Sequence, residues 1–311
     1  MQRDRRTAVA RRRELSTILA FVLISAVGGL GGASTASASQ LVDRNALLVS
    51  FGVNAKGEAL ITYRAGGKVR RVLAWGAINA IAPTRSRPQV AFKIDYAGGW
   101  GKYHRDYWRT FKGVCDPYHG PPLAWEVAAC KSPDGSYWAL QSWQRMLPNY
   151  GVTPTPAQKA WELRLSHWTG DLPALAVMVD WAWQRWDHLF GTFIYAGDPV
   201  FGFRSTAAGV PLDSFGRNVY VDTFDSVYGS GWRRENSFLT HTGTGAFCYS
   251  FNPHGSHPSG KGKRYRATVE GPGVTPDVTW LGRAPGPYDS RLDAAANQLE
   301  RDLDDPACRP N

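Results

Sequence analysis

The residues whose types and spacing most suggest chemistry are two carboxylates, Glu162 and Asp180. Apolar residues alternate over 161–167 and over 175–181, which predicts two strands joined by a turn at 169–173. In that hairpin, Glu162 lies directly opposite Asp180 at a separation of about 5 Å. Two carboxyl groups at this separation are typical of a retaining glycosidase, in which one acid donates a proton and the other attacks or stabilises the sugar cation.

The alternative interpretation of this pair is an ion cluster. Like charges that face each other destabilise a sheet unless a neighbouring group neutralises them. Arg164, two residues along the same face, or Arg185 could bridge both acids, because a guanidinium fits planar carboxylates. The catalytic interpretation needs a third group that converges on the pair, and the sequence points to none.

The aromatic side chains suggest a second kind of chemistry, the stacking of sugar rings. The chain holds 13 Trp, 13 Tyr and 13 Phe, and every Trp lies after residue 38. Trp181 and Trp183 share a strand face with apolar residues, so we expect them in the core. Trp100, Trp108 and Trp186 are the candidates for an exposed platform on which a sugar stacks, with polar neighbours binding its hydroxyls.

Motifs for other chemistries are missing or incomplete. The sequence contains no G-x-S-x-G, H-E-x-x-H or calcium-loop motif, although a Ser–His–Asp triad needs no fixed spacing. His167 falls on the apolar face of its strand, so we expect a core residue. His254 and His257 are spaced as a metal pair, but they lie in a Gly- and Pro-containing loop without a nearby carboxylate. The sequence therefore predicts neither a metal site nor a cofactor.

Four cysteines predict two disulfide bonds: Cys115, Cys130, Cys248 and Cys308. Three pairings are possible, and the shorter loops favour Cys115 with Cys130 and Cys248 with Cys308. Zinc binding is the alternative, but no C-x2-C spacing is present.

Residues 1–38 predict export by a signal peptide. Six Arg precede an apolar stretch that begins at Leu15, and small residues follow as far as a cleavage motif at residues 36–38. A membrane anchor is the alternative, but the apolar stretch is shorter than the ~20 residues that span a bilayer. Export could use the general secretory route or the twin-arginine route. We therefore expect a secreted, extracellular protein with no transmembrane segment after residue 38.

The charge balance narrows the class of partner. The whole chain carries a formal net charge of +10, and 30 Lys and Arg against 24 Asp and Glu remain after residue 38. This excess is smaller than a nucleic-acid-binding domain usually shows, so no nucleic-acid partner is expected. A hydrophobic content of 43% excludes a disordered chain.

The elements that must position these residues are mainly strands. Short alternating segments separated by Gly, Pro, Asp and Ser predict an antiparallel β-sandwich or jelly-roll-like body over residues 39–311. One α-helix is expected over residues 289–305, capped by Asp289 or Ser290, with an apolar stripe that includes Leu292, Ala296 and Leu299. Pro residues near 148–157 mark either a subdivision of this domain or a loop within one sandwich.

These features together predict a secreted protein that binds an extracellular or cell-wall polymer, with carbohydrate as the expected class, through Trp-lined loops. The first alternative is a secreted polysaccharide hydrolase that uses Glu162 and Asp180 as its acid pair. The second is a structural envelope protein without catalytic activity, whose Trp side chains fill the core.

Overall fold

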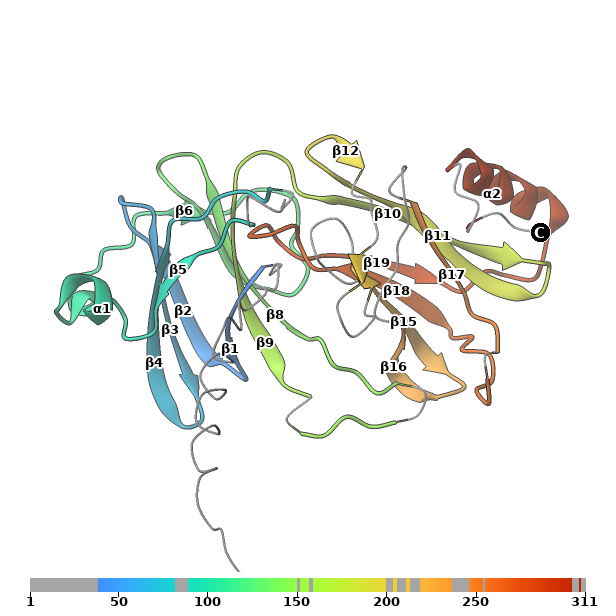
Figure 1. Cartoon of the computed structure of the whole chain (residues 1–311), viewed down its shortest axis with the longest axis horizontal. Coiled ribbons are helices and arrows are strands. Elements are labelled where there is room, and N and C mark those ends of the chain that lie inside the picture. Colours follow the sequence, from blue (N-terminus) through green and yellow to red (C-terminus); the bar gives the residue numbers. More distant parts are fainter. Residues whose placement is uncertain are drawn as a thin grey trace, which may run out of the picture. The chain divides into compact units, whose positions relative to one another are not determined.

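The computed structural model shows a chain that is mainly β. It describes residues 39–81, 89–149, 152–156, 159–199, 204–205, 211–212, 219–236, 246–253, 255–303 and 308. The strands form antiparallel sheets and one long helix lies near the C-terminus, which confirms the predicted β-sandwich-like body with a C-terminal helix (Figure 1). The predicted signal peptide, residues 1–38, lies outside the described residues.

Two sheets surround the first hydrophobic core. One sheet has the order β2 (Leu47–Val53), β3 (Glu58–Ala65), β4 (Lys68–Trp75) and β5 (Lys93–Asp95). The other has the order β1 (Gln40–Arg44), β9 (Trp161–Trp168), β8 (Tyr137–Gln144), β7 (Glu126–Lys131) and β6 (Asp116–Pro117). The buried side chains of this core include Ile61, Val72, Trp138, Leu163 and Leu165. Two short helices, α1 (Trp100–Tyr103) and η1 (Tyr107–Arg109), follow β5.

Later strands surround a second core. Strand β11 (Trp186–Tyr195) pairs with β10 (Ala174–Ala182), β12 (Asp198–Pro199) and β17 (Ala246–Ser250). A four-stranded sheet has the order β16 (Gly229–Asn236), β15 (Val219–Ser226), β18 (Arg264–Val269) and β19 (Val278–Arg283). Strands β13 (Arg204–Ser205) and β14 (Pro211–Leu212) form a separate pair. The core side chains between these strands include Leu189, Val221, Phe247, Tyr265 and Ala267.

The predicted hairpin between residues 161–167 and 175–181 is wrong. Both segments are strands, but β9 pairs with β8 and β1, whereas β10 pairs with β11. Leu163 and Leu165 pack in the first core, while Val177 belongs to the second. The apolar alternation marks a buried face on each strand, and the two faces are buried in different cores. Glu162 and Asp180 are therefore not cross-strand neighbours.

The C-terminal helix forms where the sequence predicts it but presents a different face. Helix α2 (Ser290–Asp302) is capped by Asp289, whose side chain accepts hydrogen bonds from the backbone N–H groups of Arg291 and Leu292. Leu292 and Leu299, expected in the core, are 74% and 51% exposed. The buried side chains of α2 are Asp293, Ala296 and Glu300. The predicted apolar stripe is therefore right for Ala296 and wrong for Leu292 and Leu299.

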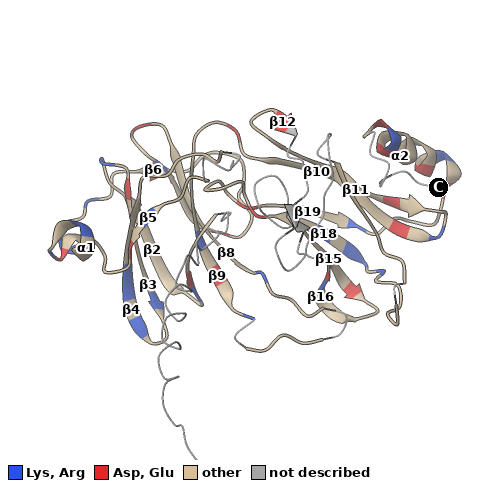
Figure 2. Cartoon of the chain, viewed as in Figure 1, with Lys and Arg blue, Asp and Glu red and all other residues tan. Residues whose placement is uncertain are grey.

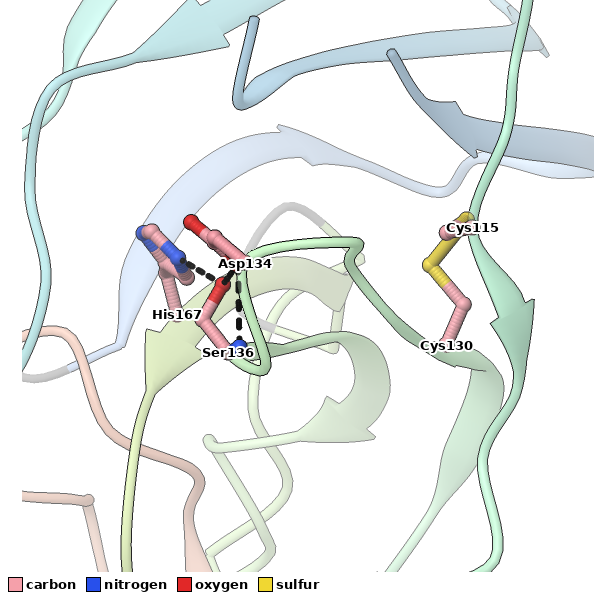
Figure 3. The surroundings of a disulfide bond; sticks show 5 residues. All are labelled: Cys115, Cys130, Asp134, Ser136 and His167. Atoms are coloured by element: carbon pink, nitrogen blue, oxygen red, sulfur yellow. Dashed lines mark hydrogen bonds between the residues drawn. A yellow bond between two sulfur atoms is a disulfide. The ribbon is translucent and has the colours of Figure 1, made fainter. Parts of the chain in front are cut away.

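One of the two predicted disulfides is present. Cys115 and Cys130 are bonded, with 5.7 Å between their Cα atoms, and they tie the segment before β6 to the end of β7 (Figure 3). The structure does not form the second predicted bond: Cys248 lies on β17 and Cys308 is buried near the C-terminus, each as a thiol. The pairing rested on loop length alone, which does not specify the direction of the Cβ atoms.

Polar contacts join residues before and after the predicted boundary at 148–157, and that subdivision stays a prediction. The buried Asp277 accepts hydrogen bonds from Ser39 Oγ at 2.6 Å and from Trp143 Nε1 at 2.7 Å, and its backbone carbonyl accepts one from Gln141 Nε2. Among the described residues, no helix has the length and apolar content needed to cross a membrane.

Candidate functional site: a tryptophan-lined pocket

Four Trp side chains gather around one pocket of about 310 Å³. This volume is at the lower end of the ~300–1,000 Å³ range of small-molecule sites. The described lining consists of aromatic, apolar and hydrogen-bonding side chains: Trp125, Trp143, Gln144, Leu147, Pro148, Trp161, Trp232 and Arg266.

Two of these rings come from neighbouring strands of one sheet. Trp143 lies on β8 and Trp161 begins β9, where it pairs with Gln144. Trp125 precedes β7 with a φ of 51°, a left-handed conformation that is costly for a residue with a Cβ. Its ring stacks on that of Trp143, with the centroids 5.1 Å apart and the planes 13° from parallel. Trp232 comes from β16.

The Trp143 side chain is held in place by two contacts with other strands and loops. It is 3% exposed, its Nε1–H donates to the Asp277 carboxylate, and Tyr220 meets its ring edge to face at 5.7 Å between centroids. A buried indole whose N–H is satisfied loses little further freedom when a ligand binds. Trp161, on the adjacent strand β9, is 51% exposed. The pocket therefore combines one fixed ring with one solvent-facing ring.

Arg266 is the charged residue of the lining. Its Nε and Nη2 both donate to Asp222 Oδ2, at 2.9 and 2.7 Å, and its guanidinium lies 4.3 Å from the Trp232 ring centroid. Arg234 donates to the other oxygen of the same carboxylate. Two guanidinium groups therefore share one carboxylate, which leaves this side of the pocket with a positive balance.

The lining can stack planar or ring-shaped ligands and donate hydrogen bonds. Indole faces attract C–H groups and π-systems, and Gln144 and Arg266 offer polar contacts. None of the described lining residues is a carboxylate, so the pocket offers a cationic ligand indole faces but no counter-charge, beside the guanidinium of Arg266. In the described part of the chain, no group of three or more His, Cys, Asp or Glu side chains could hold a metal ion.

The three Trp residues predicted as a platform lie elsewhere. Trp100 is 54% exposed on α1. Trp108 on η1 has Arg71 over its ring at 3.8 Å, and Trp186 begins β11 with Arg185 at 4.6 Å. None of the three lines the pocket. Sequence reasoning missed the four pocket Trp residues because they belong to four separate segments, which only the tertiary fold brings together.

Glu162 has the surroundings of an ion cluster. It is buried and contacts Arg164 at 2.8 Å, Arg44 at 3.0 Å and Arg145 at 3.4 Å. Burial alone would raise the pKa of Glu162, but Arg164 and Arg145 hold it below its ordinary value. The carboxyl group is therefore ionised at neutral pH and cannot serve as a proton donor.

Asp180 lies in a second, separate cluster. It is buried on β10 and its pKa is raised to about 7 by burial and by a hydrogen bond with Asp293 on α2. The neighbouring acids in this cluster are Asp293 and Glu300, not Glu162. The acid-pair interpretation of Glu162 and Asp180 was argued from a hairpin that the chain does not form, and that geometry is lost.

A Ser–His–Asp contact occurs near the disulfide (Figure 3). His167 Nε2 lies 2.9 Å from Ser136 Oγ, and Ser136 donates from Oγ and from its backbone N to Asp134 Oδ1, at 2.5 and 2.9 Å. The other ring nitrogen of His167 contacts the Ala77 carbonyl. In a hydrolytic triad the carboxylate orients the His, whereas here it binds the Ser.

Burial also argues against a catalytic role for this contact. Ser136 and His167 are both buried, and burial lowers the pKa of His167 to about 4. The imidazole stacks on Trp138 with 3.7 Å between centroids. His167 is therefore a neutral, hydrogen-bonded core residue, as predicted from its apolar strand face. His254 lies outside the described residues.

Comparison of the chain with protein-family models, with curated proteins and with solved structures finds no match, so the pocket itself is the starting point for function.

Proposed function

We propose that this protein binds an extracellular or cell-wall carbohydrate polymer, and that the Trp-lined pocket is the binding site. The single observation that carries the proposal is the gathering of four Trp side chains from separate segments around one pocket of about 310 Å³. Sugar rings stack on indole faces while amide and guanidinium groups bind their hydroxyls. The predicted signal peptide supports an extracellular polymer as the ligand.

The exposure of Trp161 supports a binding role over a purely structural one, because a half-exposed indole contributes little to a core. The hydrolase alternative has no comparable support, since Glu162 is held ionised among three Arg side chains.

The experiment is a depletion assay with insoluble polymers. Purified protein is incubated with peptidoglycan, cellulose and chitin, and the protein left in the supernatant is measured. We expect one polymer to deplete the protein, and we expect Trp161→Ala to abolish that depletion while the fold is retained, because Trp161 is half-exposed.

Trp100→Ala is the matched control. It removes an equally exposed indole that does not line the pocket, and depletion should be unchanged. A Trp161→Ala protein that still binds as the wild type does, or a wild type that binds none of the polymers, contradicts the proposal. The latter result favours a structural role for the Trp side chains.

A further inference from the structure

The sheet that supplies Trp232 and Arg266 to the pocket carries an unusual outer face. Residues directly opposite each other in an antiparallel sheet share a face. Phe224 pairs with Trp232 on one side and with Arg264 on the other, and Arg264 pairs with Arg283. One step along the sheet, Arg266 pairs with Leu281. We call Phe224, Trp232, Arg264, Arg266, Leu281 and Arg283 the arginine–aromatic face.

The burial pattern separates this face from the core. On β18, Tyr265 and Ala267 point into the second core, while Arg264 is exposed and Arg266 is partly exposed. Leu281 is 61% exposed and Arg283 is exposed on the edge strand β19. The arginine–aromatic face is therefore directed away from the core, and it reaches the pocket at Trp232 and Arg266.

Guanidinium groups and rings alternate on this face. Arg264 lies 4.1 Å from the Phe224 ring centroid and 5.6 Å from that of Trp232, and Arg266 lies 4.3 Å from Trp232. Stacking on a ring holds a guanidinium flat and leaves its N–H groups directed outward along its edges. The stacked arginines are thus ordered before any ligand binds.

The charges on this face do not cancel. Asp222, 1% exposed, is shared by Arg234 and Arg266. Among the described residues, Arg264 and Arg283 make no direct ion pair, and Asp225 interacts electrostatically with both Lys263 and Arg264. Lys and Arg positions lie on this sheet together with a smaller number of acidic positions, among them Asp222 and Asp225 (Figure 2). The face therefore carries a local positive excess beside an aromatic pocket whose lining includes one charged residue, Arg266.

We infer that the polymer bound by the pocket is a carboxylated polysaccharide, whose chain continues from the Trp-lined pocket onto the arginine–aromatic face. This inference rests on the proposed function and adds the chemical class of the sugar. The indole rings stack the sugar rings, and the planar guanidinium groups of Arg264 and Arg283 bind uronate carboxylates through paired N–H donors. Arg266 sits at the junction of pocket and face and orients the chain.

Single-stranded nucleic acid is the other polyanion that binds aromatic and Arg side chains together. The predicted export and the modest net charge after residue 38 favour the acidic polysaccharide. An oligonucleotide therefore belongs in the test as a competing ligand.

The test compares polygalacturonate with its methyl-esterified form, which has the same backbone without the charge. Binding to the full protein is followed by intrinsic Trp fluorescence at low salt. We expect polygalacturonate to bind at least about tenfold more tightly than the ester, because a charge-assisted hydrogen bond contributes at least that factor. We also expect the affinity for polygalacturonate, but not for the ester, to fall as salt is raised.

The double variant Arg264→Gln, Arg283→Gln identifies the surface. Both side chains are exposed, so the fold should persist, and near-UV circular dichroism verifies this. We expect the variant to lose about tenfold in affinity for polygalacturonate and to keep its affinity for the ester. Arg291→Gln, an exposed arginine on α2, is the matched control and should bind as the wild type does.

Each outcome separates the two proposals. Equal binding of both polymers leaves the carbohydrate proposal standing and overturns the charge inference, as does a double variant that binds polygalacturonate normally. Binding of neither polymer overturns this inference, while the proposed function is decided separately by the depletion assay with peptidoglycan, cellulose and chitin. Tighter binding of a poly-dT oligonucleotide than of polygalacturonate overturns the assignment of the face to a polysaccharide.

Discussion

The buried carboxyl groups of Glu162, Asp180 and Glu300 have two kinds of surroundings. Glu162 is stabilised in its ionised form by three Arg side chains, whereas Asp180 and Glu300 are buried with raised pKa values beside other carboxyl groups. The first arrangement is a structural ion network next to the Trp-lined pocket. In the second, carboxyl groups packed against or on α2 keep their protons to a higher pH than usual. Neither forms the two-carboxylate geometry of a glycosidase.

Replacing Glu162 should be strongly destabilising. Glu162→Gln leaves the buried Arg164 with less compensating charge, and breaking a buried pair costs about 3 kcal/mol or more. The free energy of unfolding from urea titration measures this loss. Glu126→Gln, an exposed acid on β7, is the control and should change stability by less than about 0.5 kcal/mol. A Glu162→Gln protein as stable as the control would refute the ion-network interpretation.

Glu58 should make part of the stability depend on acid pH. Burial raises its pKa, but hydrogen bonds from Lys102, Tyr103 and Asn54 outweigh this and lower it to about 2. Because the folded pKa lies below the ordinary value, the contribution is present above about pH 4.5 and is lost as pH falls through 2.

The comparison of wild type with Glu58→Gln between pH 2 and pH 6 measures that contribution. We expect the wild type to be the more stable protein at pH 6, and the difference to shrink toward pH 2. A difference that stays constant over this range would contradict the assignment of the pH dependence to Glu58.

At the scale of elements, α2 is held by polar groups rather than by its leucines. Asp293 and Glu300 on α2 face Asp180 on β10 and His188 on β11, and His188 Nδ1 lies 3.2 Å from Glu300 Oε1. Burial raises the pKa of Glu300 to about 8 and lowers that of His188 to about 4. Burial therefore favours the neutral forms of Glu300 and His188.

Docking of α2 should therefore weaken as pH rises. The raised pKa values of Asp180 and Glu300 mean that their contribution is complete below about pH 4 and is lost as pH rises through 7 to 8. His188 acts in the opposite sense, and its contribution is lost as pH falls from 6.5 toward 4. Two acids against one base leave a net loss of docking at alkaline pH.

Hydrogen exchange of the α2 amides at pH 6 and pH 9, corrected for intrinsic rates, measures this effect. We expect protection of α2 to fall at pH 9 in the wild type while the amides of β3 stay protected. Glu300→Gln should weaken this dependence, and Asp302→Asn, an exposed acid on the same helix, should not. Equal protection of α2 at both pH values would contradict the account.

The disulfide makes a separate contribution to stability. Cys115 and Cys130 are 15 residues apart, and a loop of this length corresponds to about 3 kcal/mol of stabilisation through the unfolded state. We expect the double variant Cys115→Ser, Cys130→Ser to lose roughly this amount in urea unfolding. An unchanged midpoint would show that the bond does not contribute as the loop-closure model requires.

Elements could be predicted from the sequence, but their partners could not. The alternating segments at 161–167 and 175–181 are β9 and β10, and the cap and position of α2 also agree. Alternation shows that one face of a strand is buried and leaves open which strand lies beside it. The sequence pattern predicts that the leucines of α2 are buried, because it treats Asp293 and Glu300 as solvent-facing groups. In the structure, Asp293 and Glu300 are buried beside Asp180 and His188 instead.

The pocket could not be predicted for the same reason. Trp125, Trp143, Trp161 and Trp232 are far apart along the chain and none belongs to a motif. The sequence shows that Trp residues are numerous, which favours an aromatic binding surface. It pointed instead to Trp100, Trp108 and Trp186, because loop positions suggest exposure but not convergence.

At the scale of the whole molecule, the two cores are linked by the groups behind the pocket. Asp277 accepts from Trp143 and Ser39, and Tyr220 of the second group of strands meets the Trp143 ring. The fixed ring of the pocket therefore depends on contacts between residues far apart in the chain. A ligand seated there contacts Trp161 from β9 and Trp232 from β16 at once, so binding should also raise the stability of the folded chain.

The most direct measurement of the central claim uses protein labelled with 5-fluorotryptophan. Each of the 13 Trp residues gives a ¹⁹F resonance, and single variants assign the signals. Soluble oligosaccharides of the polymer that depletes the protein are then added. We predict that the shifted resonances are those of the pocket residues, namely Trp125, Trp143, Trp161 and Trp232. Shifts confined to Trp100, Trp108 and Trp186, or no shifts at saturating oligosaccharide, would contradict the account.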